Sequence, residues 1–419
     1  MLLPKELIGL IANSLSAGDA VSLGISNKQM KRNLSRSDYG YHVYKTIDVG
    51  TIFDITNGYK RRDHVIGHFS YFIIQQLDQV PHLPLDTQYI WFAWDFNQEI
   101  TACTIFPPKL TQIEFGHRFN QPMENIHLPD TLTHLIFGNK FNQPLDTCKL
   151  PESLTHIIFG SDYDQPLDNC KFPTSLTHLI FDAFFKQPLY HLKFLKSLTH
   201  LTFGWTYDQP LDRLCLPESL THLHFGDGFD KSIDNLTLPK SLTHLSFGWS
   251  FDKCVDNLCL PDSLTHLTFG WYFDQSIEKL RLPSSLTYLE LGHHFKQSLH
   301  GIKFPKPLSH LSIGWYHLDN SKFLKQTNLI CLTVHDAYHL NIVDLDLPYS
   351  ITNLVLKNFN QPIDGFSFPP LLSHLDLGSE FNHPIDHISF PNSLTQIKVG
   401  IKFQQSVERL NIKLRLITC

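Results

Sequence analysis

The sequence lacks any long apolar run. None of its apolar stretches approaches the roughly 18 residues that a membrane-spanning helix needs. The first residues, MLLPKELIGLIANSL, carry charge where a signal peptide needs an uninterrupted apolar segment. We therefore expect a cytoplasmic protein with no membrane association.

An excess of positive charge and closely spaced cysteine pairs are also missing. The chain has 34 Lys and Arg residues against 40 Asp and Glu residues, a formal net charge of -6, which does not provide the dense basic surface that binds phosphate backbones. Its 8 cysteines form no CxxC pair, which favours reduced thiols over a disulfide or zinc framework. We expect no nucleic-acid partner.

The usual catalytic motifs are absent as well. The sequence contains no glycine-rich phosphate loop, no GxSxG and no HExxH, so phosphoryl transfer and serine or zinc hydrolysis lose their usual anchors. We expect no enzyme activity, no cofactor and no metal site.

What the sequence does contain is a repeat of 22 residues. The stretch SLTHL or a close relative returns with its leucine at positions 110, 132, 154, 176, 198, 220, 242, 264, 286 and 308. Less regular copies begin at Leu329, Ile351, Leu372 and Leu394, and a degenerate first copy begins at Thr87. Such strict register over 419 residues predicts a solenoid of stacked repeats.

Each copy has room for one short strand. With the leucine as offset 0, apolar residues recur at offsets 3, 5, 9, 13, 16 and 18, and only offsets 3 and 5 show the alternation of a strand. Glycine at offset 6 suits the end of that strand, and prolines at offsets 12 and 19 exclude a long helix. The pattern predicts a parallel β-sheet on the concave face and a mostly irregular convex side.

The repeat also resembles known families. Its L-x-x-L-x-L spacing resembles the strand of leucine-rich repeats, and the segments at 119–122, 141–144, 359–362 and 381–384 resemble the signature of FNIP repeats. Gln stands at the third signature position where the family has Ile, and the copies at 232, 254, 276 and 298 lack the Pro. The resemblance covers about residues 84–412 and implies an α/β repeat solenoid of the leucine-rich-repeat type.

Two further expectations follow from this resemblance. Residues 316–345 match least well, which predicts a kink or a change of curvature there. FNIP repeats occur mainly in amoebae and in large DNA viruses that infect them, so the resemblance allows a viral protein acting in host cytoplasm.

The N-terminus differs from the repeat. Residues 1–40 are expected to form a small helical module, 41–86 a connector or degenerate leading coils, and 87–419 the solenoid. The module resembles an F-box at Leu3, Pro4, Leu7, Ile8, Ile11 and Leu15. An F-box implies docking onto a Skp-type adaptor of a cullin ubiquitin ligase. Alternatively, or in addition, these helices cap the open end of the solenoid.

Histidine and aspartate recur at fixed offsets. Histidine at offset 2, as in His200, could form a metal-binding rail, but a straight column spaces its side chains along a line, so we expect a stacked imidazole ladder, hydrogen-bonded between coils. Aspartates at offset 10, such as Asp208, and at offset 14, such as Asp212, are expected to bond backbone N–H groups in turns. Calcium-binding loops are the alternative for these aspartates.

Two columns are the candidates for binding a target protein. Offset 4 varies between copies, and its candidates are Thr202, His224, Ser246 and Thr268. Offset 7 carries Trp205, Trp249, Trp271 and Trp315, which either pack over the coil edge or serve as binding anchors. The sequence thus predicts a monomeric substrate-recognition adaptor of an SCF-type ubiquitin ligase. The alternative is a protein-binding scaffold with no ligase link.

Overall fold

A computed structural model describes residues 43–47, 69–190, 192–408 and 415–418 and shows a parallel β-solenoid of about 15 turns. The chain divides into two compact units, Met1–Phe185 and Lys186–Cys419. The residues expected to form the F-box-like module lie outside the described residues, as does the connector segment 48–68.

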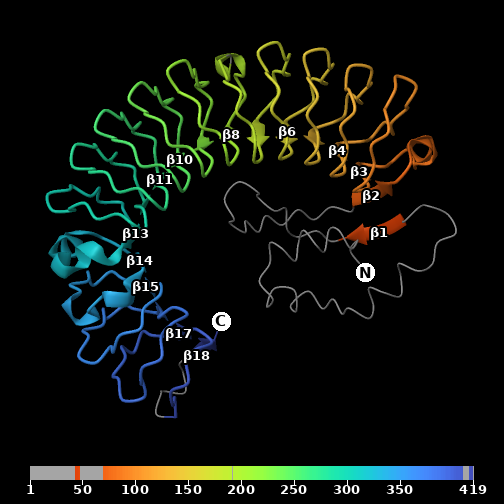
Figure 1. The fold of residues 1–419 in the computed structure, drawn as a ribbon. Helices are drawn as coiled ribbons and strands as arrows, with labels where there is room; N and C mark the ends of the chain where they lie inside the picture. The colour runs from red at the N-terminus through yellow and green to blue at the C-terminus, as the bar shows by residue number, and fades with distance from the viewer. Residues whose placement is uncertain (1–42, 48–68, 191, 409–414, 419) are drawn as a thin grey trace. The chain divides into compact units, whose positions relative to one another are not determined.

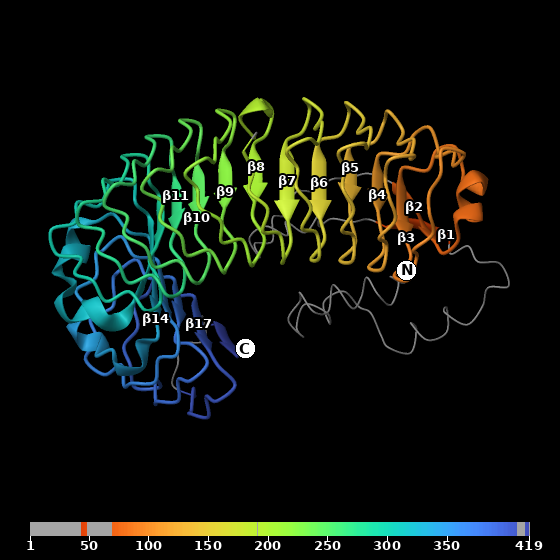
Figure 2. The ribbon, with the colours of Figure 1, turned by 45° about the horizontal axis from the view of Figure 1, so that its top comes forward.

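The first unit contains seven described strands. They are β1 (Val43–Ile47), β2 (Phe69–Ile74), β3 (Tyr89–Phe92), β4 (Gln112–Glu114), β5 (His134–Ile136), β6 (His156–Phe159) and β7 (His178–Phe181), with the 3-10 helix η1 (Leu77–His82) after β2. From β2 to β7 each strand pairs in parallel with the next, and β1 pairs antiparallel with β2. Figure 2 shows the arrows of β4 to β7 side by side and pointing the same way.

The second unit continues the same pattern. Its strands are β8 (His200–Thr202), β9 (His222–His224), β10 (His244–Ser246), β11 (His266–Thr268), β12 (Tyr288–Glu290), β13 (His310–Gly314), β14 (Cys331–His335), β15 (Asn353–Leu356), β16 (His374–Asp376), β17 (Gln396–Val399) and β18 (Arg415–Thr418). Each of these pairs in parallel with the next in chain order. In each unit the strands line the inner side of the curve and the turns form the outer side (Figure 1).

Three-residue strands result from the alternation of burial in each copy. In β8 the central Leu201 is buried, whereas His200 and Thr202 on either side are half-buried. Offsets 5, 9 and 13 also point inward, since Phe203, Tyr207 and Leu211 are buried, whereas offset 18 lies nearer the surface, as in the exposed Phe194. The expected positions of the strand and of the core at offsets 3, 5, 9 and 13 are therefore confirmed.

The remainder of each regular coil consists of three tight turns. Each turn is closed by an N–H that donates to the carbonyl three residues earlier, at offsets 6 to 9, 13 to 16 and 19 to the next 0. In the coil that begins at Leu220 these bonds run from Phe229 to Gly226, from Leu236 to Ile233 and from Leu242 to Pro239, at 3.0–3.1 Å.

The expected parallel sheet and irregular convex side are confirmed, but the α/β label does not apply to the described residues. Their helical segments are all 3-10: η1, η2 (Leu192–Phe194), η3 (Trp315–Gln326), η4 (Ala337–His339) and η5 (Ile342–Asp344). The three turns already use the chain that an outer helix would need, and the prolines deny it backbone donors. No helix in the described part of the chain is long and apolar enough to cross a membrane.

A double column of aromatic rings fills the core. Where both offsets 5 and 9 are aromatic, the two rings stack within the coil, as in Phe247 and Phe251 at 4.2 Å between ring centroids. Each ring also stacks on its equivalent in the next coil, as in Phe247 on Phe269 at 5.7 Å and Phe251 on Phe273 at 6.0 Å. Near-parallel stacking repeats because adjacent strands hold equivalent residues in register.

Glycine at offset 6 is required by close approach between coils. A Cβ at Gly248 would lie 2.0 Å from the carbonyl oxygen of Gly226, and one at Gly226 would lie 1.7 Å from that of Gly204. No side chain fits such a space, because the obstacle is backbone rather than a movable side chain.

Replacing one of these glycines should therefore destabilise the solenoid strongly. Gly248→Ala forces a methyl group into the backbone of the previous coil, and we expect it to cost about 3 kcal/mol or more of unfolding free energy. Urea unfolding followed by circular dichroism measures the change.

The matched control is Gly365→Ala. Gly365 has φ +74 and nothing within 4 Å of an added Cβ, so it meets only left-handed backbone strain of about 1 to 2 kcal/mol. Equal losses in the two variants would contradict the close-approach explanation.

Candidate interaction surface

Two rows of half-buried side chains run across the strands of the second unit. They occupy offsets 2 and 4 and lie on either side of the buried leucine. The strands pair in register, so each row joins equivalent positions: Thr202 lies opposite His224, His224 opposite Ser246, and Ser246 opposite Thr268. The sheet thus presents both rows on its inner face.

The offset 2 row is a stacked imidazole ladder, as the sequence predicted. His200, His222, His244 and His266 stack with ring centroids 4.1 Å apart, and in the first unit His134, His156 and His178 stack at 4.0–4.1 Å. Ring nitrogens carry their lone pairs in the ring plane, so face-to-face rings direct them side by side rather than at one point. This geometry disfavours a metal rail.

The ladder contains hydrogen bonds within each coil. Each ring contacts the hydroxyl that precedes it, as in His244 Nδ1 and Thr243 Oγ1 at 2.9 Å. Thr243 Oγ1 also donates its single proton to the carbonyl of Thr221 at 3.0 Å. The hydroxyl must therefore accept from the ring, so the neutral ring carries its proton on Nδ1.

Burial keeps several of these histidines neutral. It lowers the ring pKa of His134, and it lowers that of His266 together with the nearby His310. His224, in the offset 4 row, has its pKa lowered by burial against a weaker opposing effect of Asp227. Its Nδ1 is buried with no hydrogen-bond partner among the described residues.

The aspartates at offset 10 hold one coil to the next. The Oδ1 of Asp230 accepts the backbone N–H of Asp252 at 2.9 Å, and the Oδ1 of Asp252 accepts that of Asp274 at 2.9 Å. At offset 14, Asp212 accepts from the side-chain amide of Asn235 at 3.0 Å. The offset 10 aspartates thus accept backbone N–H groups, as expected, but from the next coil rather than from their own turn. Asp212 accepts from a side-chain amide instead of a backbone N–H.

The tryptophan column divides into two kinds of position. Trp205 and Trp249 are 63% and 57% exposed, whereas Trp271 and Trp315 are half-buried. Trp271 stacks on His293 with ring centroids 3.6 Å apart, and Trp315 stacks on Tyr316 at 4.5 Å. Packing thus accounts for Trp271 and Trp315, and exposure leaves Trp205 and Trp249 as the candidate anchors.

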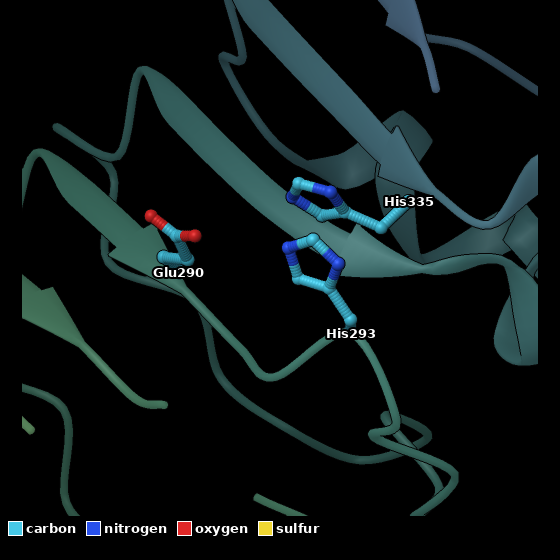
Figure 3. A group of neighbouring side chains, drawn as sticks. All are labelled: Glu290, His293 and His335. Carbon is cyan, nitrogen blue, oxygen red and sulfur yellow. The ribbon is translucent and has the colours of Figure 1, made fainter. Parts of the chain in front are cut away.

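Sequence inspection missed a cluster at one end of the offset 4 row. Glu290 ends β12, His293 follows it, and His335 ends β14, and one potential ligand atom from each lies within 4.8 Å of the others. Figure 3 shows one nitrogen of each imidazole on the side that faces the carboxylate. Such a group could hold a metal ion, although the sequence predicted no metal site.

Burial controls the charge of this cluster. It lowers the pKa of His293 to about 4 and that of His335 to about 3, and it raises the pKa of Glu290. Ser312 Oγ lies 2.7 Å from His335 Nε2, and the hydroxyl of Tyr288 donates to Glu290 at 2.8 Å. The two rings are therefore neutral near pH 7.

A sequence signal for this cluster does exist. His335 occupies offset 6 of the copy that begins at Leu329, where most regular copies carry glycine and only Asp182 in the copy that begins at Leu176 departs. A large ring at that offset indicates a local change in the spacing of the coils. The histidine in place of glycine is visible when the copies are aligned, but only the structure shows which residues surround it.

Comparison with known proteins identifies the repeats. The family model described as FNIP Repeat matches residues 89–140, 141–184, 163–195, 185–228, 229–272, 273–316, 341–380 and 359–402. The same scan detects no F-box domain. No curated protein matches the chain.

Solved structures, two of them titled as leucine-rich repeat proteins, are also similar to this chain. The structure titled as CroV588, a novel circular LRR protein, is 32% identical, with 82% of this chain and 67% of that chain covered and a TM-score of 0.38. A leucine-rich repeat protein from Bacteroides ovatus ATCC 8483 is 13% identical, with coverage of 91% and 100% and a TM-score of 0.20. The pneumococcal vaccine antigen PcpA is 15% identical, with coverage of 79% and 79% and a TM-score of 0.17.

Acid should weaken the folded solenoid. The ring pKa values of His134, His224 and His266 lie below the ordinary 6.5 in the folded protein, so below that pH the unfolded chain binds more protons and unfolding becomes more favourable. We expect a lower unfolding temperature at pH 5.5 than at pH 7.5, and a smaller decrease in His266→Gln.

Two buried carboxylates have the opposite effect on how stability changes with pH. Burial raises the pKa of Glu114 and Glu290, which favours the folded state in acid and opposes the histidines. A net loss of stability must then come from the histidines, and an unchanged unfolding temperature between the two pH values would contradict the prediction.

Proposed function

Because this chain belongs to the FNIP repeat family, we propose that it is a non-enzymatic protein-interaction protein whose inner sheet face binds a target protein. The observation that carries this proposal is the in-register offset 4 row, Thr202, His224, Ser246 and Thr268, beside the exposed Trp205 and Trp249.

The repeated backbone supports this role physically. Stacked coils fix the positions of the offset 4 side chains, while their identity changes from threonine to histidine to serine without disturbing the buried leucines. Binding to a preformed surface loses little conformational entropy. Large exposed aromatic side chains are typical energetic centres of protein interfaces.

The finer proposal is a substrate-recognition adaptor of a cullin-based, SCF-type ubiquitin ligase. The F-box-like residues Leu3, Pro4, Leu7, Ile8, Ile11 and Leu15 would dock onto a Skp-type adaptor while the solenoid holds the target in the cytoplasm. The ligase would supply the chemistry, so this chain would need no catalytic residue. Outside that complex the chain would be a monomer.

A scaffold without a ligase link is the second candidate. The family scan that matches the repeats detects no F-box domain, which favours this alternative. In that case residues 1–40 would only cap the end of the solenoid, as the terminal units of repeat proteins commonly do.

Adaptor binding separates the two candidates. The full chain is compared with a chain lacking residues 1–35 in a pull-down with a purified Skp-type adaptor. If the N-terminus is an F-box, the full chain retains the adaptor and the truncated chain loses it, and circular dichroism verifies that the truncated solenoid is folded. Failure of the folded full chain to bind would leave the scaffold as the function.

Target binding should depend on the exposed tryptophans. Trp205→Ala and Trp249→Ala each remove an interface anchor, and we expect at least about tenfold weaker binding of the target recovered with the full chain from cytoplasmic extract. Titration of the recovered target by biolayer interferometry measures the change.

Tyr349→Ala is the matched control. Tyr349 is 78% exposed but lies in the turn that begins at Pro348, away from the strands. Its removal should leave target binding unchanged. If both tryptophan variants bind as the unaltered chain does, the inner face between β8 and β10 is not the binding surface.

A further inference from the structure

We propose that Glu290, His293 and His335 form a binding site for one divalent transition-metal ion of the zinc type. This inference is independent of the proposed target and of any ligase link. It rests on three donors from two strand ends that converge on one point.

An irregular coil brings the two histidines together. In regular coils the offset 7 side chain stacks on the next coil, as Trp271 does on His293. His293 instead stacks on His335, with ring centroids 3.5 Å apart, although the coil that begins at Leu308 separates them in sequence. That coil makes room because η3 begins directly after Gly314.

Gly314 permits the close approach. It pairs with His335 across β13 and β14, and a Cβ on it would lie 2.6 Å from the carbonyl oxygen of His293. A residue with a side chain would push the loop of His293 away from β14. Glycine at this position therefore lets the backbone of His293 approach β14.

The donor set suits zinc. Two imidazole nitrogens and one carboxylate are a common set of three protein ligands for this ion, which leaves a fourth position for water. Imidazole donors favour Zn²⁺ and related transition metals over Mg²⁺ and Ca²⁺, which prefer oxygen ligands. Ligand atoms about 3.4 Å apart surround a tetrahedral ion, so donors already within 4.8 Å need only small side-chain rotations.

Neighbouring side chains already orient these donors. Tyr288 donates to the carboxylate of Glu290 from the same strand, and Ser312 contacts His335 from the strand between them. A hydrogen bond to a carboxylate, like that from Tyr288, commonly holds a metal ligand in place. His335 is only 8% exposed. The His335 nitrogen that faces Glu290 (Figure 3) is Nε2, which Ser312 Oγ contacts, so a bound ion would replace that hydrogen bond.

The first unit provides a natural comparison. Glu114 and His117 have the same spacing as Glu290 and His293, Tyr89 donates to Glu114, and His117 stacks on Trp94 at 4.0 Å. The position that corresponds to His335 is Gly160, two coils further on. This pair therefore has a tyrosine donor to its carboxylate, here from the preceding strand, but lacks the third metal donor.

Zinc titration of the chelator-treated full chain tests the proposal. Isothermal titration calorimetry with Zn²⁺ alone at pH 7.5 should show one ion bound per chain, and Mg²⁺ should not compete. Glu290→Gln and His293→Asn should each weaken zinc binding at least about tenfold, whereas Glu114→Gln should bind zinc as the unaltered chain does.

Two outcomes would overturn the proposal. One is the absence of stoichiometric zinc binding by the unaltered chain. The other is equal zinc affinity in Glu290→Gln, His293→Asn and the unaltered chain, because the ion would then belong to another group such as the imidazole ladder.

Cobalt keeps the proposal testable if a variant fails to fold. Co²⁺ bound to the unaltered chain by two imidazoles and a carboxylate should give the visible absorption bands of a four- or five-coordinate site, and added Zn²⁺ should abolish them. Circular dichroism of each metal-free variant verifies folding. Visible bands of only octahedral, water-like cobalt would overturn the proposal.

Discussion

The close backbone approach between successive coils is the constraint on which the rest of the structure depends. Strands pair at a fixed step, and at offset 6 a carbonyl oxygen lies where a Cβ would otherwise stand, as at Gly226 and Gly248. Every coil must then repeat its length and turns, because a coil of different shape would separate these backbones. The 22-residue period of the sequence follows from this requirement.

Because the coils stack in register, equivalent residues of successive coils lie next to one another in columns. Phe247 stacks on Phe269, His244 on His266, and Asp230 accepts the N–H of Asp252, each contact joining residues 22 apart. A polar side chain in one coil thus finds its hydrogen-bond or stacking partner at the equivalent position of the neighbouring coil. Residues that resemble catalytic groups along the chain become structural once they stack.

Departures from the repeat have the greatest functional interest. Offset 4 changes its side chain freely because the sheet holds it at the half-buried surface without needing its identity. The coil that begins at Leu308 departs further, since η3 replaces its first turns and allows His293 to reach His335. An irregular coil within a regular array thereby creates a site that neither regular neighbour could hold.

The sequence by itself determined the period, the buried offsets, the stacked histidines and the structural role of the offset 10 aspartates, because each of these is a local pattern copied many times. The α/β label of the class does not apply to the described residues, because tight turns and 3-10 helices form the irregular convex side that the prolines indicated. Only the tertiary structure decided which tryptophans are exposed and that Glu290, His293 and His335 converge. Those outcomes depend on the distance in space between one coil and the next, which cannot be read from the spacing of residues along the chain.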